Sequence, residues 1–522
     1  MKMKNLTERR GILFLGAMVF AVMSFFGSAE AMTFEPNDDT KIDCDVTLSW
    51  AGGVRVEDRD LNTKAMKDVN ANDGGWNFEQ WDMTNNRWTA IADIDVQYKK
   101  VGVFARPRAF YDFVYMGDNS NPGLDKHWSN NNYLAGAISK PDKFDSAVKD
   151  IMGTETQFLD YFFYSNFSLG GHPVDFRAGQ QVIAWGEQLF LPGGVASAMS
   201  YADLTAANIP GVELKEVYMP SESASLRMDI LNNLTAMGFY QWEWEHHIFN
   251  QPGSYYSDMD LVGEAGRGVI LPSPYPPYYA VAPRGKDQLT RDDGQYGLGF
   301  IYRAERLAQT EFGFYYINYH EKSPLIHLVV PPLVPPTAMN YYFSYPEDVK
   351  LYGMSVSTFI NGVSLSGEFT YRNNFPLSVR GVYEDCNMVQ GQMAALYTLG
   401  ENPIFDDVAL AGEIGFNKVL GVDGEDMTSS DYSWGYSISV TPKYYQVLTD
   451  LDMNMPISYK GNPAGNSPNK TFTEGADSAS IGVTLVWRSV YKMELKYVEY
   501  FNPYRSGLAD RDFIGMNLKY TF

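Results

Sequence analysis

Cysteine is almost absent from this chain, since only Cys44 and Cys386 occur among its 522 residues. Two cysteines can form one bridge at most, which excludes a disulfide-rich scaffold. Histidine is also scarce, at six residues, and the chain has no Gly-x-Ser-x-Gly elbow, no phosphate-binding loop and no cysteine pattern for zinc. These absences favour a protein without an enzyme active site, a bound metal or a cofactor.

Positive charge is in deficit as well, with 41 Lys and Arg against 63 Asp and Glu and a net charge of −22. Nucleic acid is therefore not an expected partner, because phosphate binding requires a basic surface. Long apolar runs are limited to one, at the N-terminus. A helical membrane protein with several spans needs about 20 apolar residues for each span, so that class is excluded too.

The single apolar run belongs to a predicted export signal. Four basic residues come before the apolar stretch 11–22, and Ala29-Glu30-Ala31 supplies the small-x-small pattern of a cleavage site. An uncleaved anchor helix is the alternative. We expect cleavage near Ala31, which leaves residues 32–522 as a single exported domain.

Aromatic residues are abundant, at 15% of the chain, and they occur within a recurring alternation of apolar and polar residues. Successive side chains of a β-strand lie on opposite faces, so such alternation predicts strands between two different environments. The sequence therefore predicts an all-β fold. The clearest examples are residues 42–50, 92–98, 240–244, 365–371, 434–440 and 493–497.

The two faces of these segments differ as the faces of a membrane barrel do. Each segment is about 10 residues long, the length of a tilted strand across a bilayer. The apolar faces often begin or end in Trp or Tyr, as at membrane interfaces, while the opposite faces carry full charges that suit a wet lumen. A large secreted β-protein is the alternative, but its many apolar faces would need a dry partner sheet.

The last segment supports the membrane interpretation. Its apolar face ends in the aromatic residue Phe522, which is similar to the terminal insertion signal of Gram-negative outer-membrane barrels. About eighteen segments fit the alternation, so we predict a transmembrane antiparallel β-barrel of about 16–18 strands in a Gram-negative outer membrane. The residues of that last apolar face are Ile514, Met516, Leu518, Tyr520 and Phe522.

The connections between the segments are unequal in length. Strict up-down order fails between 187 and 245 and between 374 and 405, where a strand is missed or a segment folds into the barrel. The small-residue stretch 187–211 is either such an inward constriction or an ordinary outer loop. Short periplasmic turns are expected near Lys99-Lys100, Gly170-Gly171, Glu305-Arg306 and Gly362, and long outer loops near 57–86, 116–155, 246–293, 321–347 and 454–477.

Two of the long loops are unusually apolar, in residues 269–279 and 323–336. Prolines keep both stretches out of a central strand. Such loops either receive a hydrophobic molecule at the outer face or fold over the barrel mouth and pack on each other. The candidate contact residues in the second loop are Leu325, Ile326, Leu328, Val329, Val330 and Leu333.

Charged side chains on the lumen faces form a second set of candidates. Opposite charges lie close together on several strands, which favours ladders that brace the barrel over a selectivity filter. Cys44 is expected on the lipid face and Cys386 between strands, so we predict two free thiols. The lumen and constriction candidates are Arg106, Arg108, Asp112, Arg177, Trp185, Glu187, Glu213, Lys215, Glu243, Glu245, Glu368 and Arg372.

Several stretches resemble one outer-membrane family, catalogued as domain of unknown function thirteen hundred and two. They are Arg55–Asp60, Arg177–Glu187, Pro210–Glu216, Phe239–Trp244, Tyr315–His320, Tyr345–Gly353 and Asp510–Phe513. The resemblance implies a barrel that is often encoded near a lipoprotein-sorting-like periplasmic protein and an inner-membrane exporter, and so traffic of lipids or other hydrophobic compounds. The family often has Cys-Gly where this chain has Pro252-Gly253, which implies no bridge at that place. It supplies no catalytic residues.

These features lead us to expect a non-enzymatic outer-membrane channel or carrier for a hydrophobic or amphiphilic compound. Its path would run from the apolar loops through a constriction near Trp185-Gly186-Glu187 and Glu213-Lys215. The alternatives are a general diffusion porin or polysaccharide-type channel, and a structural partner of a periplasmic complex. The expected partners are outer-membrane lipid, lipopolysaccharide and the barrel assembly machinery.

Overall fold

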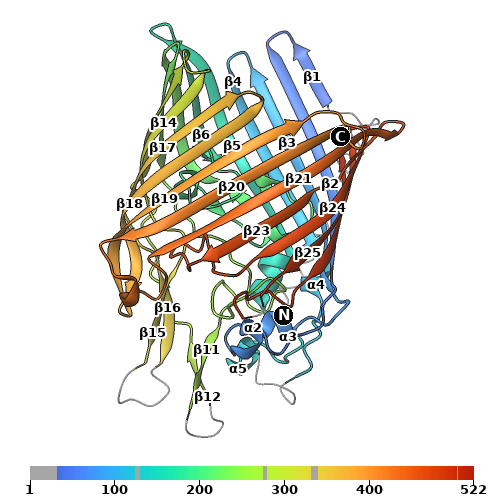
Figure 1. The fold of residues 1–522 in the computed structure, drawn as a ribbon, viewed down its shortest axis with the longest axis vertical. Helices are drawn as coiled ribbons and strands as arrows, with labels where there is room; N and C mark the ends of the chain where they lie inside the picture. Colours follow the sequence, from blue (N-terminus) through green and yellow to red (C-terminus); the bar gives the residue numbers. More distant parts are fainter. Residues whose placement is uncertain (1–31, 124–129, 274–278, 331–338, 503) are drawn as a thin grey trace.

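The computed structural model describes residues 32–123, 130–273, 279–330, 339–502 and 504–522. Within them the chain forms a closed antiparallel β-barrel of 18 strands, which confirms the predicted fold and the upper end of the predicted strand number (Figure 1). The predicted signal, residues 1–31, lies outside the described residues.

The wall is built from strands that follow one another along the chain. Most neighbours in the wall are consecutive, because each strand returns beside the previous one after a turn or loop. The strands are β2 (Thr40–Arg55), β3 (Met83–Tyr98), β4 (Val101–Asp112), β5 (Thr154–Leu169), β6 (His172–Gln181), β9 (Ser221–Leu231), β10 (Leu234–Gln241), β13 (Gln295–Ala304), β14 (Thr310–Tyr319), β17 (Val349–Ile360), β18 (Val363–Val379), β19 (Val382–Leu399), β20 (Asp407–Leu420), β21 (Tyr432–Leu448), β22 (Leu451–Asn454) with β23 (Ile457–Ala464), β24 (Ser478–Trp487), β25 (Tyr491–Tyr500) and β26 (Phe513–Thr521). β22 and β23 count as one wall strand, since both lie between β21 and β24 and are separated only at Met455 and Pro456.

The last strand closes the barrel against the first. β26 pairs with β2 from Thr47–Thr521 to Arg55–Phe513, and Phe522 exchanges two backbone hydrogen bonds with Val46, at 2.7 and 2.9 Å. A short strand, β1 (Met32–Asn37), pairs with β2 beyond the end of β26. Closure leaves no open sheet edge along the seam, which is the condition for a β-structure in lipid.

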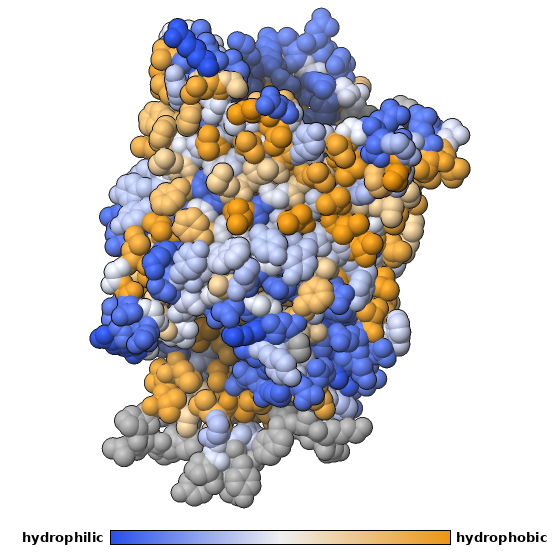
Figure 2. Space-filling model, viewed as in Figure 1, coloured by the Kyte–Doolittle hydropathy of each residue, from blue (hydrophilic) through white to orange (hydrophobic). Residues whose placement is uncertain are grey.

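The two faces of the wall have the predicted polarity. Outward side chains are apolar and accessible, for example Met393 at 69% and Leu298 at 57% exposure, whereas lumen-facing Gln390 and Asn417 are 1% and 0% exposed. Figure 2 shows apolar side chains over much of the outer wall, with polar side chains gathered at both ends. This pattern is that of a transmembrane barrel with a polar interior.

The connections divide into a short-turn end and a long-loop end. All four predicted short turns lie at one end, together with the C-terminus, and the long loops lie at the other (Figure 1). The predicted loop 454–477 is too long, because β23 occupies Ile457–Ala464. The remaining loop is 465–477.

Two strands escaped the sequence pattern. β9 lies within 187–245 and β19 within 374–405, the two regions where up-down order fails in the alternation. In β9, small residues such as Ser223 and Ala224 weaken the contrast between the faces. In β19, lumen-facing Met388 and Ala394 are apolar and buried against the interior, so the polar half of the alternation is lost.

The long loops fold into a compact cap over one end of the barrel. Aromatic side chains of distant loops meet there in one buried cluster that includes Phe78, Tyr115, Phe144 and Tyr255. No helix among the described ranges is long and apolar enough to cross a membrane. The elements of the cap are α2 (Lys64–Lys67), α3 (Asp73–Trp76), α4 (Phe113–Met116), α5 (Asn131–Leu134), α6 (Ser146–Val148), the π-turn Lys149–Gly153, β11 (Gly268–Pro272), β12 (Tyr279–Pro283), β15 (Leu325–Val329) and β16 (Asn340–Ser344).

Both cysteines are free thiols, as predicted. Cys386 does not lie between strands, however. It belongs to β19, a strand that the sequence pattern missed, and it is buried against the barrel interior.

The lipid face of β19 allows a test of the membrane assignment. Met393→Arg places a charge in the middle of the strand and should lower the free energy of unfolding in vesicles by about 2–4 kcal/mol, because the guanidinium must be buried in hydrocarbon. Leu399→Arg, on the same face at the end of β19, should cost only about 0–1 kcal/mol. Urea titration with tryptophan fluorescence measures both values, and equal costs would contradict the assignment.

Candidate functional site

A segment of the chain folds into the lumen, which decides between the two interpretations of 187–211. The segment, residues 182–220, leaves the wall after β6 and returns at β9. Hereafter it is called the inward segment. Its regular elements are two 3-10 turns (Ala196–Ala198 and Ala206–Asn208), β7 (Tyr201–Ala202), α7 (Leu214–Val217) and β8 (Tyr218–Met219).

Two wall carboxylates hold the first half of the inward segment by its backbone. Glu368 of β18 accepts hydrogen bonds from the N–H groups of Glu187, at 3.0 Å, and Val195, at 3.2 Å. Glu413 of β20 accepts from the three consecutive N–H groups of residues 189–191. Because this stretch has no sheet or helix of its own, these side chains satisfy donors that would otherwise be buried without partners.

Arg372 completes this attachment with the opposite charge. It is buried and donates to the carbonyl oxygens of Gly193, at 2.5 Å, and Gly194, at 3.1 Å. Both Glu368 and Arg372 are among the lumen charges that the sequence predicts to brace the barrel. Both side chains instead make their hydrogen bonds to the inward segment, one to its donors and the other to its acceptors.

The second half of the segment is fixed to the opposite part of the wall. Glu213 is ion-paired with Lys519 of β26 and, at 3.2 Å, with Lys215. Lys215 in turn lies 3.5 Å from Asp93 of β3. The inward segment therefore contacts wall strands on both sides of the lumen and crosses it.

Apolar side chains fill the space between the inward segment and the wall. Val195 and Met199 are fully buried, and they pack in one cluster with Ile317 and Leu351 of the wall. Trp185 lies edge-on to Phe239, with ring centroids 5.1 Å apart. Each fully buried side chain of this kind contributes about 1.5–3 kcal/mol to the packing of the segment against the wall.

The charges of β4 brace the wall, as predicted. Arg106 bonds Asp93 at 2.5 Å and Asp160 at 2.7 Å on the two neighbouring strands. Arg108 bonds Glu155 at 2.8 Å. Asp112 is buried at the end of β4, 3.6 Å from Arg87.

Glu243 and Glu245 do not lie on the lumen face of a strand, contrary to the sequence interpretation. β10 ends at Gln241, and the alternation of residues 240–244 continues past it by coincidence. Trp244 is 5% exposed inside the cap rather than on the lipid face. Both glutamates belong to the long-loop end, where Glu243 accepts a hydrogen bond from the backbone of Glu222 at 3.0 Å.

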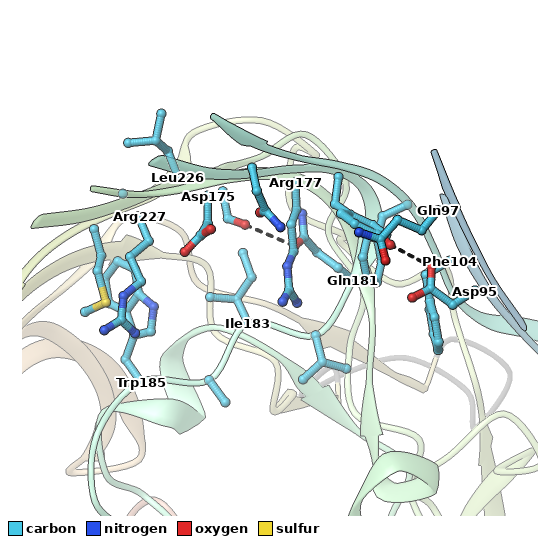
Figure 3. Close-up of a pocket in the computed structure, with 18 residues that line it drawn as sticks. Asp95, Gln97, Phe104, Asp175, Arg177, Gln181, Ile183, Trp185, Leu226 and Arg227 are labelled. Atoms are coloured by element: carbon cyan, nitrogen blue, oxygen red, sulfur yellow. Dashed lines mark hydrogen bonds between the residues drawn. The ribbon is translucent and has the colours of Figure 1, made fainter. Parts of the chain in front are cut away.

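A cavity of about 750 Å³ lies beside the inward segment, on its short-turn side. Wall strands β3 to β6, β9 and β10 line it, and residues 182–185 form its floor. Figure 3 shows Arg177 and Arg227 pointing into it, while Leu226 points away from it. Its lining includes Phe104, Phe162, Tyr164, Asp175, Arg177, Trp185 and Arg227.

The two arginines of the cavity differ from those of β4. Neither Arg177 nor Arg227 makes an ion pair with a described residue, and Arg177 lies over the ring of Phe162, 5.3 Å from its centroid. Asp175 stands opposite Arg227 in the β6–β9 register. The cavity therefore places two arginines that make no ion pair, together with the carboxylates of Asp95 and Asp175, next to aromatic surface. The sequence named Arg177 and Trp185 but missed Arg227, because it missed β9.

The apolar loops form two hairpins, β11–β12 and β15–β16, at the long-loop end. Val269 and Ile326 pack with Phe343 and Tyr345 in a cluster under these hairpins. Leu328 and Val330 remain 45% and 50% exposed, and Figure 2 shows apolar side chains gathered in this region. Packing thus accounts for part of the apolar sequence and leaves part of it accessible. Leu333 lies outside the described residues.

Comparison with known proteins assigns the family. A model of the family described as Protein of unknown function (DUF1302) matches residues 12–522. The chain belongs to this family. No curated protein matches the chain.

Three solved structures illustrate the similarity in fold. Pseudomonas aeruginosa OccK1 (OpdK) is 11% identical, with a TM-score of 0.42 over 93% of this chain and 98% of that one. Acinetobacter baumannii OccAB4 is 10% identical, with a TM-score of 0.42 over 94% and 100%. Salmonella typhi OmpF in complex with daunomycin is 9% identical, with a TM-score of 0.41 over 94% and 100%. These low values carry no information about a substrate of this chain.

Removal of the two wall carboxylates should release the inward segment. Glu368→Ala with Glu413→Ala leaves buried N–H donors unpaired, at a cost of about 1–3 kcal/mol each. A cysteine introduced by Ala198→Cys, in a Cys44→Ser and Cys386→Ser background, is buried in the parent structure. We expect a water-soluble maleimide to label it at least about tenfold faster in the double variant.

The matched control is Glu384→Ala, which removes an exposed carboxylate from the neighbouring strand β19. It should leave the labelling rate unchanged. Equal rates in the control and in the double variant would show that Glu368 and Glu413 do not hold the segment.

Proposed function

We propose that this protein is an outer-membrane channel for amphiphilic anions, molecules with an apolar body and one negatively charged group. It acts on them by passage alone, without a chemical step. The observation that carries the proposal is the cavity in which Arg177 and Arg227 lie unpaired beside aromatic side chains. The proposal keeps the predicted amphiphilic substrate and adds the sign of its charge.

The chemistry of the cavity supports this substrate class. A carboxylate, sulfonate or phosphate accepts charge-assisted hydrogen bonds from a guanidinium in fixed geometry. Phe104, Phe162 and Trp185 offer the apolar surface that the rest of such a molecule requires. A neutral lipid would leave the arginines without partners, and a small hydrophilic anion would leave the aromatic surface wet.

The inward segment argues against a general diffusion porin. A general porin keeps an open aqueous lumen, whereas here residues 182–220 cross it and pack against both sides of the wall. Passage would require part of this segment to move. We propose that its first half, near Glu187, is the gate between the long-loop end and the cavity.

The proposed route joins the two ends of the barrel. The exposed part of the β15–β16 hairpin would collect the compound at the outer face, and the cavity would hold it on the periplasmic side. A periplasmic lipoprotein-sorting-like protein and an inner-membrane exporter, the partners implied by the family resemblance, would then meet the short-turn end.

Arg177 provides the direct test of the substrate charge. Arg177→Ala should raise the dissociation constant of decanoate by about tenfold or more, since a hydrogen bond to a charged group contributes about 1.5–3 kcal/mol. Decanol, which has the same apolar body without the charge, should bind wild type and variant alike. Isothermal titration calorimetry on the purified barrel measures both ligands.

Arg306→Ala is the matched control, because it removes the same charge from an exposed turn outside the cavity. It should leave decanoate binding unchanged. An equal loss in both variants, or an equal loss of decanol binding in Arg177→Ala, would refute specific recognition of the anion in the cavity.

The hairpin β15–β16 provides a test of the route. Leu328→Ser with Val330→Ser should slow uptake of dilute decanoate into proteoliposomes about fivefold, because the two exposed apolar side chains together contribute about 1 kcal/mol to capture. Binding in the cavity should stay the same. Leu307→Ser, at a side chain 59% exposed on a short turn, is the control. Unchanged uptake in the double variant would exclude the hairpin from the route.

A further inference from the structure

Two carboxylates are buried side by side in the cap. Asp73, the first residue of α3, is 2% exposed, and Asp260, in the loop between β10 and β13, is fully buried. The backbone N–H of Asp73 donates to Asp260 at 3.1 Å, and that of Asn131 donates to Asp73 at 2.9 Å. Three loops that are distant in sequence thus meet at this pair.

Five oxygen atoms around this pair have no hydrogen-bond partner. They are one carboxylate oxygen each of Asp73 and Asp260 and the side-chain oxygens of Asn72, Asn131 and Asn132. All five residues are at most 6% exposed. Asn72 directly precedes Asp73 in the chain. Asn131 donates its backbone N–H to Asp73, and Asn132 follows Asn131. Buried polar atoms are normally paired, so a group of acceptors without donors requires a ligand.

The side chains of Asn131 and Asn72 cannot supply the missing donors by turning over their amides. The amide nitrogen of Asn131 donates to Asn70 Oδ1 at 2.9 Å, and that oxygen is fixed as an acceptor because it also receives the N–H of Ile270 at 2.8 Å. The amide nitrogen of Asn72 donates to the carbonyl of Met66 at 3.4 Å. The free atoms of both amides are therefore oxygens.

Among the described residues, no cation forms an ion pair with either carboxylate. Arg511 is the cation whose charge acts on Asp260, but its Nη1 donates to the carbonyl oxygens of Tyr255 and Ser257, and its Nε and Nη2 make no hydrogen bond. It makes no ion pair with Asp73 or Asp260 among the described residues.

We propose that these oxygens bind one calcium ion. Calcium takes carboxylate and amide oxygens together, in flexible geometries with six to eight ligands, whereas magnesium retains several waters and a strict octahedron. The two carboxylates would neutralise its charge, and the three asparagines would supply neutral ligands. No three His, Cys, Asp or Glu side chains among the described residues form a metal site, and three of the five proposed ligands here are asparagines.

Calcium at this position would hold the cap together. The site joins the loops that contain α3 and α5 to the loop that carries Asp260. Asn70 accepts the N–H of Ile270, which ties the same region to the β11–β12 hairpin. Occupancy would thus order the outer end of the barrel without contact to the cavity, so the inference stands apart from the proposed function.

Calcium titration of the purified full-length barrel, after chelator treatment, tests the site. We expect one calcium bound per chain in calorimetry, a higher thermal midpoint with calcium than with chelator, and slower proteolysis of the cap. Asp73→Asn and Asp260→Asn should each remove both calcium binding and the thermal shift. Asp258→Asn, which changes an exposed carboxylate in the same loop, should retain them.

Three results would overturn the proposal. Wild-type protein that binds no calcium and melts at the same temperature with calcium and with chelator would leave a protonated carboxyl pair with buried water as the explanation. Binding of magnesium in preference to calcium would contradict the choice of ion. Loss of calcium binding in Asp258→Asn as well would place the ion elsewhere. The wild-type titration decides the question even if a variant fails to fold.

Discussion

The rest of this structure depends on one constraint, which is that every backbone N–H and C=O in the hydrocarbon region of a membrane needs a partner within the protein. A sheet meets this condition only when it closes, and the pairing of β26 with β2 closes it. Closure around 18 strands creates an interior wide enough for a chain segment and a cavity. The alternation of side chains then follows, since each strand has lipid on one face and the interior on the other.

The same requirement for partners explains the charges inside. The inward segment has little secondary structure, so its backbone groups cannot satisfy one another. Glu368 and Glu413 accept from its N–H groups, and Arg372 donates to its carbonyls. These wall side chains thus provide the hydrogen-bond partners that a neighbouring strand would otherwise supply to the backbone. The arginines of β4 are different, because their partners are carboxylates of adjacent strands.

Polar groups that lack a protein partner in this structure therefore indicate places where a ligand could bind. Many charged side chains inside the barrel form ion pairs, whereas Arg177 and Arg227 face the cavity without an ion pair to a described residue. The cap contains unpaired groups of negative charge, because one carboxylate oxygen each of Asp73 and Asp260 has no hydrogen-bond donor. The first arrangement fits an anion in transit, and the second fits a resident cation. Both lie next to apolar clusters that hold the surrounding chain in place.

The sequence by itself determined the class of fold, the approximate number of strands, and the order of turns and loops. These features depend on local periodicity and on counting, which need no knowledge of distant contacts. It did not determine the end of β10 or the existence of β9 and β19, because small or interior-packed residues such as Ala224 and Met388 weaken the alternation. Only the tertiary structure decided the partners: Glu213 with Lys519, Glu368 with the inward segment, and Asn131 with Asp73. These contacts join residues far apart in the chain, and their geometry is set by closure of the barrel and packing inside it, which no local pattern records.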